Sequence, residues 1–255
     1  MSRVAVIACG GRSFRTGLGA YTTKAALRLA GRSLLQYQLD FCRRSGILRV
    51  IVCCRPAHAH LLGSLLSDEE RRDVVFSMTP DDGAPGWAGT VECAMRHVAA
   101  EDEVVLLPCD NYQMAARIEP IGRSGIFLFT YTRSPEGGPS TSGPIFGRAE
   151  GEETWQSRAA AGFSGDVFTG YAVVRGGVLR EVLQGLPTSP RGEKEMTSLL
   201  AQLASTFGTE EGRAVPYLGD YLDVADLPAL ARIDARLRGG PAEGPVDVGC
   251  GVVLL

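Results

Sequence analysis

The chain has 255 residues, of which 45% are hydrophobic, enough for one large α/β domain or for one domain with a modest lobe. The formal net charge is −3 and there is no basic run, so charge gives no support to a nucleic-acid-binding protein. No apolar run approaches the length of a membrane span or of a secretory signal. We therefore expect a cytoplasmic protein whose partners are small molecules.

The pattern of cysteines also favours a cytoplasmic protein. None is spaced as a C-x-x-C pair, and several fall inside apolar, strand-like runs. This pattern favours reduced, buried thiols over a disulfide framework or a structural zinc site. The seven are Cys9, Cys42, Cys53, Cys54, Cys93, Cys109 and Cys250.

The first 110 residues alternate strand and helix patterns. The expected elements are a strand at 4–8, a helix at 34–44, strands at 49–54 and 73–78, a helix at 88–99 and a strand at 103–108. Such alternation predicts a parallel sheet with right-handed crossovers. Ligands of these sheets bind at the carboxyl ends of the strands, where Gly10, Gly11 and Asp110 would lie.

The second half of the chain differs from the first in composition and in the pattern of its expected elements. Residues 134–151 are rich in Gly, Pro and Ser and predict a loop that frames a short strand at 145–148. Further strands are expected at 167–174 and 215–222, with helices at 193–206 and 226–238. The glycine-rich tail, 239–255, fits an edge strand or an oligomer contact, and the sequence leaves both open.

The segment Gly10-Gly11-Arg12-Ser13-Phe14-Arg15 directly follows the first expected strand. Glycines there allow backbone N–H groups to approach phosphate oxygens, and Arg15 and Lys24 can add positive charge. A glycine turn with solvated cations is the alternative. A dinucleotide-binding site is disfavoured, because the G-x-G-x-x-G pattern is absent and the second strand ends at Arg55 instead of an acidic residue.

Eight segments resemble, in the same order, the signatures of the sugar-1-phosphate nucleotidyltransferases. Residues 6–15 resemble the opening G-G-x-G-T-R signature, 24–27 the K-x-L element, and 30–35 the G-[KR]-P-[LM]-[LI] turn. Residues 85–91 resemble P-L-G-T-A-G-A-[LV] beside the base, and 110–111 fall on the metal-binding G-D-N. Residues 169–171 resemble T-G-[IL]-Y, 191–197 are close to R-G-E-x-E-[IL]-T, and 221–223 resemble W-x-D. Within the family, the chain is most similar to the glucose-1-phosphate thymidylyltransferases.

The resemblance implies an α/β fold: a Rossmann-like, GT-A-like mixed sheet flanked by helices, with a smaller acceptor-binding lobe. The domain would span 1–238, with a nucleotide-binding half at 1–110, an acceptor-binding half at 111–238, and the tail outside it. The implied activity transfers a nucleotidyl group from a nucleoside triphosphate to a sugar-1-phosphate and releases pyrophosphate, with Mg²⁺ as cofactor.

The resemblance also implies a role for each matched residue. Asp110 and Asp223 would bind the metal, and Arg15 and Lys24 would neutralise the triphosphate and the leaving pyrophosphate. Those expected to bind the nucleotide are Cys9, Gly10, Gly11, Arg12, Ser13, Gly86, Gly89 and Asp110. Those expected to bind the acceptor are Asn111, Gly143, Arg158, Gly170, Arg191 and Glu193.

Several positions depart from the family pattern. Ser13-Phe14 replaces Gly-Thr, and the sugar-contacting Glu of E-K-P falls on Ser157, with Arg158 in place of Lys. These changes favour an unusual acceptor, such as a deoxy, amino or cyclitol phosphate. The resemblance itself implies dTTP or UTP as the first donors to consider. Two alternatives stay open: a cytidylyl- or guanylyltransferase for a non-sugar phosphate or phosphonate, and a non-catalytic nucleotide sensor. Each of these functions is compatible with a homo-oligomer.

Other polar and aromatic residues receive structural interpretations. His58 and His60 have no third ligand near them and are expected at a solvated helix start. The acidic run around Asp102 is expected on an exposed loop. Trp87 is expected in the core.

Overall fold

The computed structural model describes residues 2–11, 22–80, 85–114, 126–133, 145–152, 154–158, 162–205, 212–216, 220–224, 227–239, 246–247 and 253–254. Its helices are η2 (Lys24–Ala26), α1 (Leu34–Arg44), α2 (Pro56–Ser64), α3 (Asp68–Asp73), α4 (Gly86–Ala94), η3 (Met95–His97), α5 (Gly176–Gly185), α6 (Met196–Ala204) and α7 (Leu227–Leu237). No helix in these ranges is long and apolar enough to cross a membrane.

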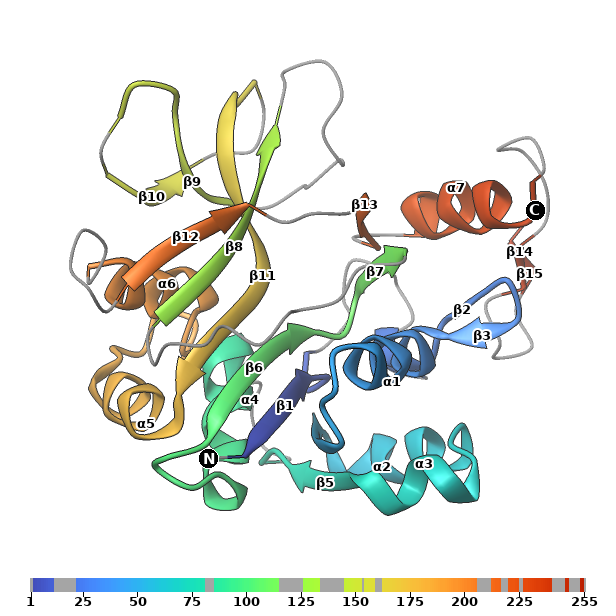
Figure 1. The fold of residues 1–255 in the computed structure, drawn as a ribbon. Coiled ribbons are helices and arrows are strands. Elements are labelled where there is room, and N and C mark those ends of the chain that lie inside the picture. Colours follow the sequence, from blue (N-terminus) through green and yellow to red (C-terminus); the bar gives the residue numbers. More distant parts are fainter. Residues whose placement is uncertain are drawn as a thin grey trace.

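Nine strands of the described ranges form one mixed sheet (Figure 1). They are β1 (Arg3–Ala8), β4 (Arg49–Cys54), β5 (Val74–Met78), β6 (Glu103–Pro108), β8 (Ile126–Arg133), β9 (Ile145–Arg148), β10 (Gln156–Arg158), β11 (Gly165–Arg175) and β12 (Gly212–Pro216). The order is β10-β9-β11-β6-β1-β4-β5, and β8 pairs with both β11 and β12. β6, β1, β4 and β5 are parallel, whereas β11 is antiparallel to β6.

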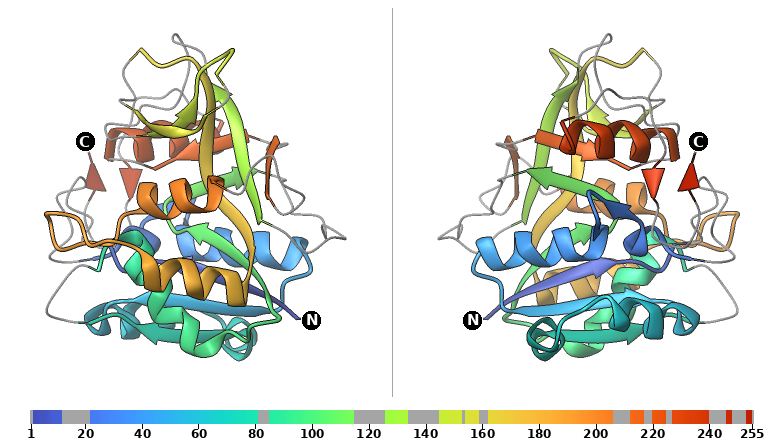
Figure 2. Two further views of the ribbon diagram at one scale, coloured as in Figure 1. Left: turned by 90° about the vertical axis from the view of Figure 1, so that its left-hand side faces the viewer. Right: turned by 90° about the vertical axis from the view of Figure 1, so that its right-hand side faces the viewer.

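Three smaller strand pairs of the described residues form short ribbons beside this sheet. They are β2 (Arg28–Leu29) with β3 (Arg32–Ser33), β7 (Asn111–Met114) with β13 (Asp220–Asp223), and β14 (Val246–Asp247) with β15 (Val253–Leu254). In Figure 2, β9 and β10, coloured yellow-green, lie at the opposite end of the molecule from the blue and teal elements of the first half.

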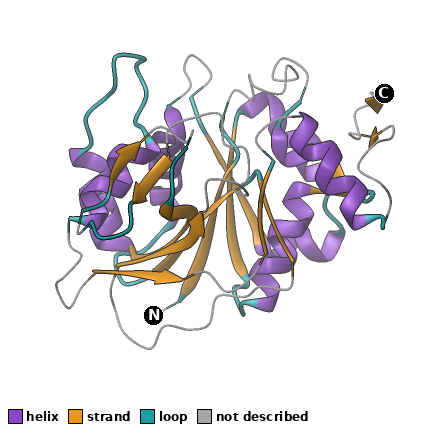
Figure 3. Ribbon diagram, turned by 90° about the horizontal axis from the view of Figure 1, so that it is seen from above, coloured by secondary structure: helices purple, strands orange, loops and turns teal. Residues whose placement is uncertain are grey.

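Helices cover both faces of the sheet, as the view in Figure 3 shows. Successive side chains of β1 point to opposite faces, as strand geometry requires. Val4 and Val6 pack in the cluster that contains α4, α5 and α6, whereas Ala5 and Ile7 pack in the cluster that contains α1 and α2. Burial on both faces explains why β1 is apolar from Val4 to Ala8 instead of alternating with polar residues.

The start of α1 is fixed by a capping box. Ser33 Oγ accepts a hydrogen bond from the Gln36 amide at 3.2 Å, and Gln36 Oε1 accepts one from the Ser33 amide at 3.0 Å. These two bonds satisfy backbone donors that a helix start leaves open. The helix begins and ends at the residues that the sequence predicts.

The predicted fold class is confirmed, with differences in the second half. One strand was expected at 215–222, but the structure has two, β12 and β13, in separate sheets. Pro216 lacks the N–H that would continue the β12 ladder. The tail does not add an edge strand to the main sheet at the residues described, because β14 and β15 pair with each other.

The expectation that Asp102 is exposed is wrong. The residue is 3% exposed, and its carboxylate accepts hydrogen bonds from Ser2 Oγ at 2.6 Å and from the Ala99 amide at 2.8 Å. Burial raises the pKa of Asp102, but these hydrogen bonds and the charge of Arg49 outweigh it, and the net pKa is lowered. Asp102 therefore anchors the turn that leads into β6.

His58 was expected in solvent and is instead buried in α2. Burial, with a contribution from the charge of Arg55, lowers its pKa. The unfolded chain therefore takes up more protons than the folded one below about pH 6.5, and stability falls as the pH drops through that region.

We expect His58→Gln to reduce the loss of unfolding free energy between pH 7.5 and pH 5.5, measured by urea denaturation. His60→Gln, on an exposed position of the same helix, is the control. A pH dependence in His58→Gln equal to that of the wild type would contradict the assignment.

The six described cysteines are unpaired, and all except the half-buried Cys93 are buried. Burial raises the pKa of Cys42 to about 12 and that of Cys54 to about 11. Because the thiolate is the reactive form, these thiols should react slowly.

In a Cys250→Ser background at pH 8, we expect Cys93 to give the fastest reaction with Ellman's reagent. A fast phase that persists after Cys93→Ser would show that another thiol is more accessible.

Candidate functional site

Two turns meet at the carboxyl edge of the parallel strands. Ala8 and Pro108 are partners in the β1–β6 register, so the segment Cys9–Gly11 and Asp110 follow neighbouring strand ends. Figure 1 shows β1 and β6 as neighbours in the sheet. Gly10 is buried, and a Cβ there would lie 2.6 Å from Thr90 Oγ1 of α4. Only glycine allows this close approach of the turn to α4.

Lys24 holds Asp110 in place. The lysine is 7% exposed, and its Nζ donates to Asp110 Oδ2 at 2.9 Å and to the Val224 carbonyl at 3.1 Å. The Val224 amide in turn donates to the Asp110 carbonyl at 2.8 Å. A buried ammonium requires such compensation, so the interactions of Lys24 fix both the turn after β6 and the chain after β13.

The β7–β13 ribbon brings the backbone of the second predicted aspartate next to the turn that holds Asp110. Asp223 is the register partner of Asn111, which directly follows Asp110. The described residues hold no group of three or more His, Cys, Asp or Glu that would bind a metal without further ligands. Mg²⁺ typically uses one or two carboxylates together with substrate phosphates and water, and two aspartates at this edge fit that demand.

Asn111 and Gly170 connect this edge to β11. Asn111 is buried, and its Nδ2 donates to the Thr169 carbonyl at 2.7 Å. Gly170 has φ +92°, and a Cβ there would lie 2.2 Å from Pro108 Cγ. The T-G-Y segment therefore packs against the end of β6, where the resemblance places the acceptor sugar.

The R-G-E-x-E segment lies against the start of α4. The Lys194 amide donates to the Pro85 carbonyl at 3.0 Å, and the Lys194 carbonyl accepts from the Ala88 amide at 3.1 Å. Gly86 has φ +74°, and a Cβ on it would lie 2.4 Å from the Lys194 carbonyl oxygen and 3.0 Å from Glu193 Cβ. A Cβ on Gly89 would likewise meet Pro85.

The structure thus gathers many of the predicted site residues at one edge. Those gathered are Cys9, Gly10, Gly11, Lys24, Gly86, Gly89, Asp110, Asn111, Gly170, Glu193 and the backbone of Asp223. Arg191 is exposed and pairs with Glu195 at 2.7 Å. Arg158 ends β10 opposite Ile145. Arg12, Ser13, Arg15 and Gly143 lie outside the described residues.

Three further residues support this site without having been predicted. Thr90 packs on Gly10, Gln38 Nε2 donates to the Asn111 carbonyl, and Lys194 binds both sides of the Gly86 turn. Lys194 occupies the variable position of R-G-E-x-E, and no local pattern marks it. Trp87 packs against the core cluster of α4, as expected.

The sequence of the first half matches a known domain. Residues 5–118 match the model of the MobA-like NTP transferase domain. The first half of this chain is therefore similar to nucleotidyltransferase domains. The match covers β1 through β7, the elements that carry Lys24 and Asp110, and the predicted resemblance is confirmed.

Solved structures share the fold over nearly the whole chain. One is a putative glucose-1-phosphate thymidylyltransferase from Bacillus anthracis, with a TM-score of 0.74 and 17% identity over 93% of this chain and 96% of that one. Another is a UDP-glucose pyrophosphorylase complexed with UDP-glucose, with a TM-score of 0.72 and 14% identity over 94% and 99%. At these identities the likeness establishes the fold.

A curated relative extends the sequence match beyond residue 118. The bifunctional protein GlmU of Sorangium cellulosum (strain So ce56) is 25% identical over 257 residues, which cover 94% of this chain. The chain spans about half the length of this relative, 52%.

Proposed function

We propose that this protein is a nucleotidyltransferase that condenses a nucleoside triphosphate with a sugar-1-phosphate, giving a nucleotide sugar and pyrophosphate in the presence of Mg²⁺. The observation that carries the proposal is the placement of Asp110. It lies at the end of β6, held by the buried Lys24, with Asp223 opposite the neighbouring Asn111. We assign the nucleotide to the half 1–110, the acceptor to the half 111–238, and the enzyme to the cytoplasm.

The proposed reaction is one in-line displacement. An acceptor phosphate oxygen attacks the α-phosphorus of the triphosphate, the bond to the β-phosphate oxygen breaks, and the electron pair leaves with pyrophosphate. Catalysis of such a step rests on positioning and on charge neutralisation. Mg²⁺ bound by Asp110 and Asp223 would supply Lewis-acid neutralisation of the phosphate oxygens.

The chain's own groups have separate tasks. The backbone of the segment from Cys9 to Ser13, with Arg12, would cradle the triphosphate, and Gly86 and Gly89 would let the backbone approach the base and ribose. Arg15 and Lys24 would balance the charge of the triphosphate and the leaving pyrophosphate.

On the acceptor side, we assign the phosphate to cationic side chains and the rest of the molecule to the end of β6. Arg158 and Arg191 would bind the acceptor phosphate, because a guanidinium matches its geometry. The remaining acceptor contacts are assigned to Asn111, Gly143, Gly170 and Glu193.

The identity of the substrates is supported by two kinds of observation. Structural neighbours carry the names glucose-1-phosphate thymidylyltransferase and UDP-glucose pyrophosphorylase, so dTTP and UTP are the first donors to test. Ser157 and Arg158 stand where the family has Glu and Lys, so deoxy, amino and cyclitol phosphates belong in the acceptor panel.

The test is Mg²⁺-dependent release of pyrophosphate across ATP, CTP, GTP, UTP and dTTP, each with a panel of sugar-1-phosphates and non-sugar phosphates. We expect one donor to give turnover with a sugar-1-phosphate. Turnover with CTP or GTP and a non-sugar acceptor would overturn the substrate assignment. Tight triphosphate binding without release for any pair would favour a nucleotide sensor.

A further inference from the structure

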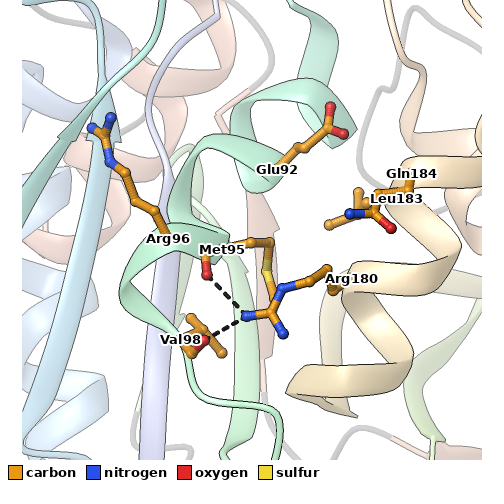
Figure 4. A pocket seen from close by; sticks show the side chains of 7 residues that line it. All are labelled: Glu92, Met95, Arg96, Val98, Arg180, Leu183 and Gln184. Atoms are coloured by element: carbon orange, nitrogen blue, oxygen red, sulfur yellow. Dashed lines mark hydrogen bonds between the residues drawn. The ribbon is translucent and has the colours of Figure 1, made fainter.

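A cavity of about 350 Å³ opens between α4, η3 and α5, and no predicted site residue lines it (Figure 4). This volume lies within the range of pockets that hold small ligands, about 300–1,000 Å³. The lining residues are Glu92, Met95, Arg96 and Val98 on one side and Arg180, Leu183 and Gln184 on the other.

Arg180 gives the cavity a fixed cation. Its Nη2 donates to the Met95 carbonyl at 3.1 Å and to the Val98 carbonyl at 2.6 Å, which hold the guanidinium against η3 (Figure 4). Within the described ranges, Nε and Nη1 of Arg180 form no hydrogen bond, and no carboxylate lies within 4 Å of the guanidinium. A positioned guanidinium with open N–H groups is suited to a phosphate or carboxylate.

The other charges of the lining do not cancel this cation. Glu92 Oε1 accepts from Lys194 Nζ at 2.8 Å, so the negative charge of Glu92 is already compensated. Arg96 points away from Arg180 in Figure 4, and its Nη2 donates to Ser77 Oγ at 3.1 Å. The remaining walls are the apolar side chains of Met95, Val98 and Leu183. Such a cavity fits a small organic anion with a compact apolar body.

Lys194 connects the cavity to the site at the sheet edge. Its Nζ bonds to two residues of the lining, the Glu92 carboxylate and the Leu183 carbonyl, both at 2.8 Å. Its backbone bonds to Pro85 and Ala88 on either side of Gly86. A ligand that displaces Glu92 or α5 would therefore move the segment that packs on Gly86.

We propose that this cavity is a second ligand site that binds a small organic anion through Arg180, and that Lys194 couples its occupancy to triphosphate binding. The coupling rests on the proposed function, because that function assigns Gly86 to the nucleotide. The binding of the anion by Arg180 does not depend on the proposed function.

Phenyl phosphate is the probe for the site, with binding measured by calorimetry in the absence of nucleotide. We expect a Kd of about 1 mM or tighter, weaker binding of inorganic phosphate because it lacks an apolar body, and a loss of at least about tenfold in Arg180→Gln. Gln184→Trp, on an exposed lining position, should block the cavity in a second way.

Arg175→Gln is the matched control, because Arg175 is exposed at the start of α5 and does not line the cavity. It should bind phenyl phosphate as the wild type does. Failure of the wild type to bind, or affinity unchanged in both Arg180→Gln and Gln184→Trp, would overturn the anion site. Binding that survives both changes would belong to another site, such as that of the acceptor phosphate.

The coupling is tested by measuring dTTP and UTP affinity with and without saturating phenyl phosphate. We expect a change of about fivefold or more in the wild type, and none in Lys194→Met, which loses both ammonium bonds but keeps an unbranched side chain one atom shorter. Equal coupling in the two proteins would overturn the role of Lys194. Absence of triphosphate binding would count against the proposed function and the coupling alone, since the Arg180 experiment judges the anion site.

Discussion

Asp110→Asn is expected to lower kcat for Mg²⁺-dependent pyrophosphate release by about 100-fold to 1,000-fold. The amide keeps the size of the side chain and an oxygen for Lys24 Nζ, but it removes the charge that a divalent cation needs. Loss of one such electrostatic contact is worth about 3–4 kcal/mol of transition-state stabilisation, and each 1.36 kcal/mol is a factor of ten. Initial rates at saturating triphosphate and acceptor, over a Mg²⁺ titration, measure the effect.

The control for this variant is Asp68→Asn. The Asp68 side chain is 96% exposed at the start of α3, far along the chain from every assigned site residue. It should turn over as the wild type does. If Asp110→Asn kept activity within about threefold of Asp68→Asn, Asp110 would not be a metal ligand and the proposed site would be misplaced.

Gly86→Ala is expected to have the largest effect on stability, a loss of about 2–4 kcal/mol in unfolding free energy. About 1 kcal/mol of this comes from φ +74°, which a side chain disfavours, and the rest from a Cβ placed 2.4 Å from the Lys194 carbonyl oxygen. Because backbone surrounds the position, the contact can be relieved only by moving the 191–195 segment. Urea denaturation at pH 7.5 measures the loss.

Gly192→Ala separates the two causes. Gly192 has nearly the same backbone conformation, φ +77°, but a Cβ there meets nothing within 4 Å. We expect it to cost only about 1 kcal/mol. Equal losses for the two variants would show that the close packing of α4 on the 191–195 segment does not contribute, and would weaken the argument that joins this segment to the site.

The first half of the fold could be predicted from local sequence because its signals are local. The runs at 4–8, 49–54 and 103–108 are apolar, short and bounded by turn residues, and each forms a parallel strand close to the predicted bounds. Ile126–Arg133 carries aromatic and β-branched residues typical of a strand, and it was not predicted. Its antiparallel pairing with β11 depends on contacts that sequence patterns do not encode.

The site could be predicted in part for the same reason. The order of motifs predicts Asp110 and Lys24, and the structure places them 2.9 Å apart. No pattern predicts that the Val224 carbonyl completes the environment of Lys24, since every residue has a carbonyl and only the β7–β13 register brings this one near.

For Asp102, the sequence gives a wrong prediction of exposure. In a run of acidic residues it looks solvated, yet Ser2 and Arg49, distant in sequence, bury it.

The fate of the phosphate label tests the central claim most directly. The donor found in the panel is supplied labelled with ³²P either at the α- or at the γ-phosphate, and the products are separated after reaction with the acceptor and Mg²⁺. Nucleotidyl transfer predicts that the α-label enters the acceptor product and that the γ-label leaves as pyrophosphate. The γ-label on the acceptor, or either label released without any acceptor product, would contradict the account.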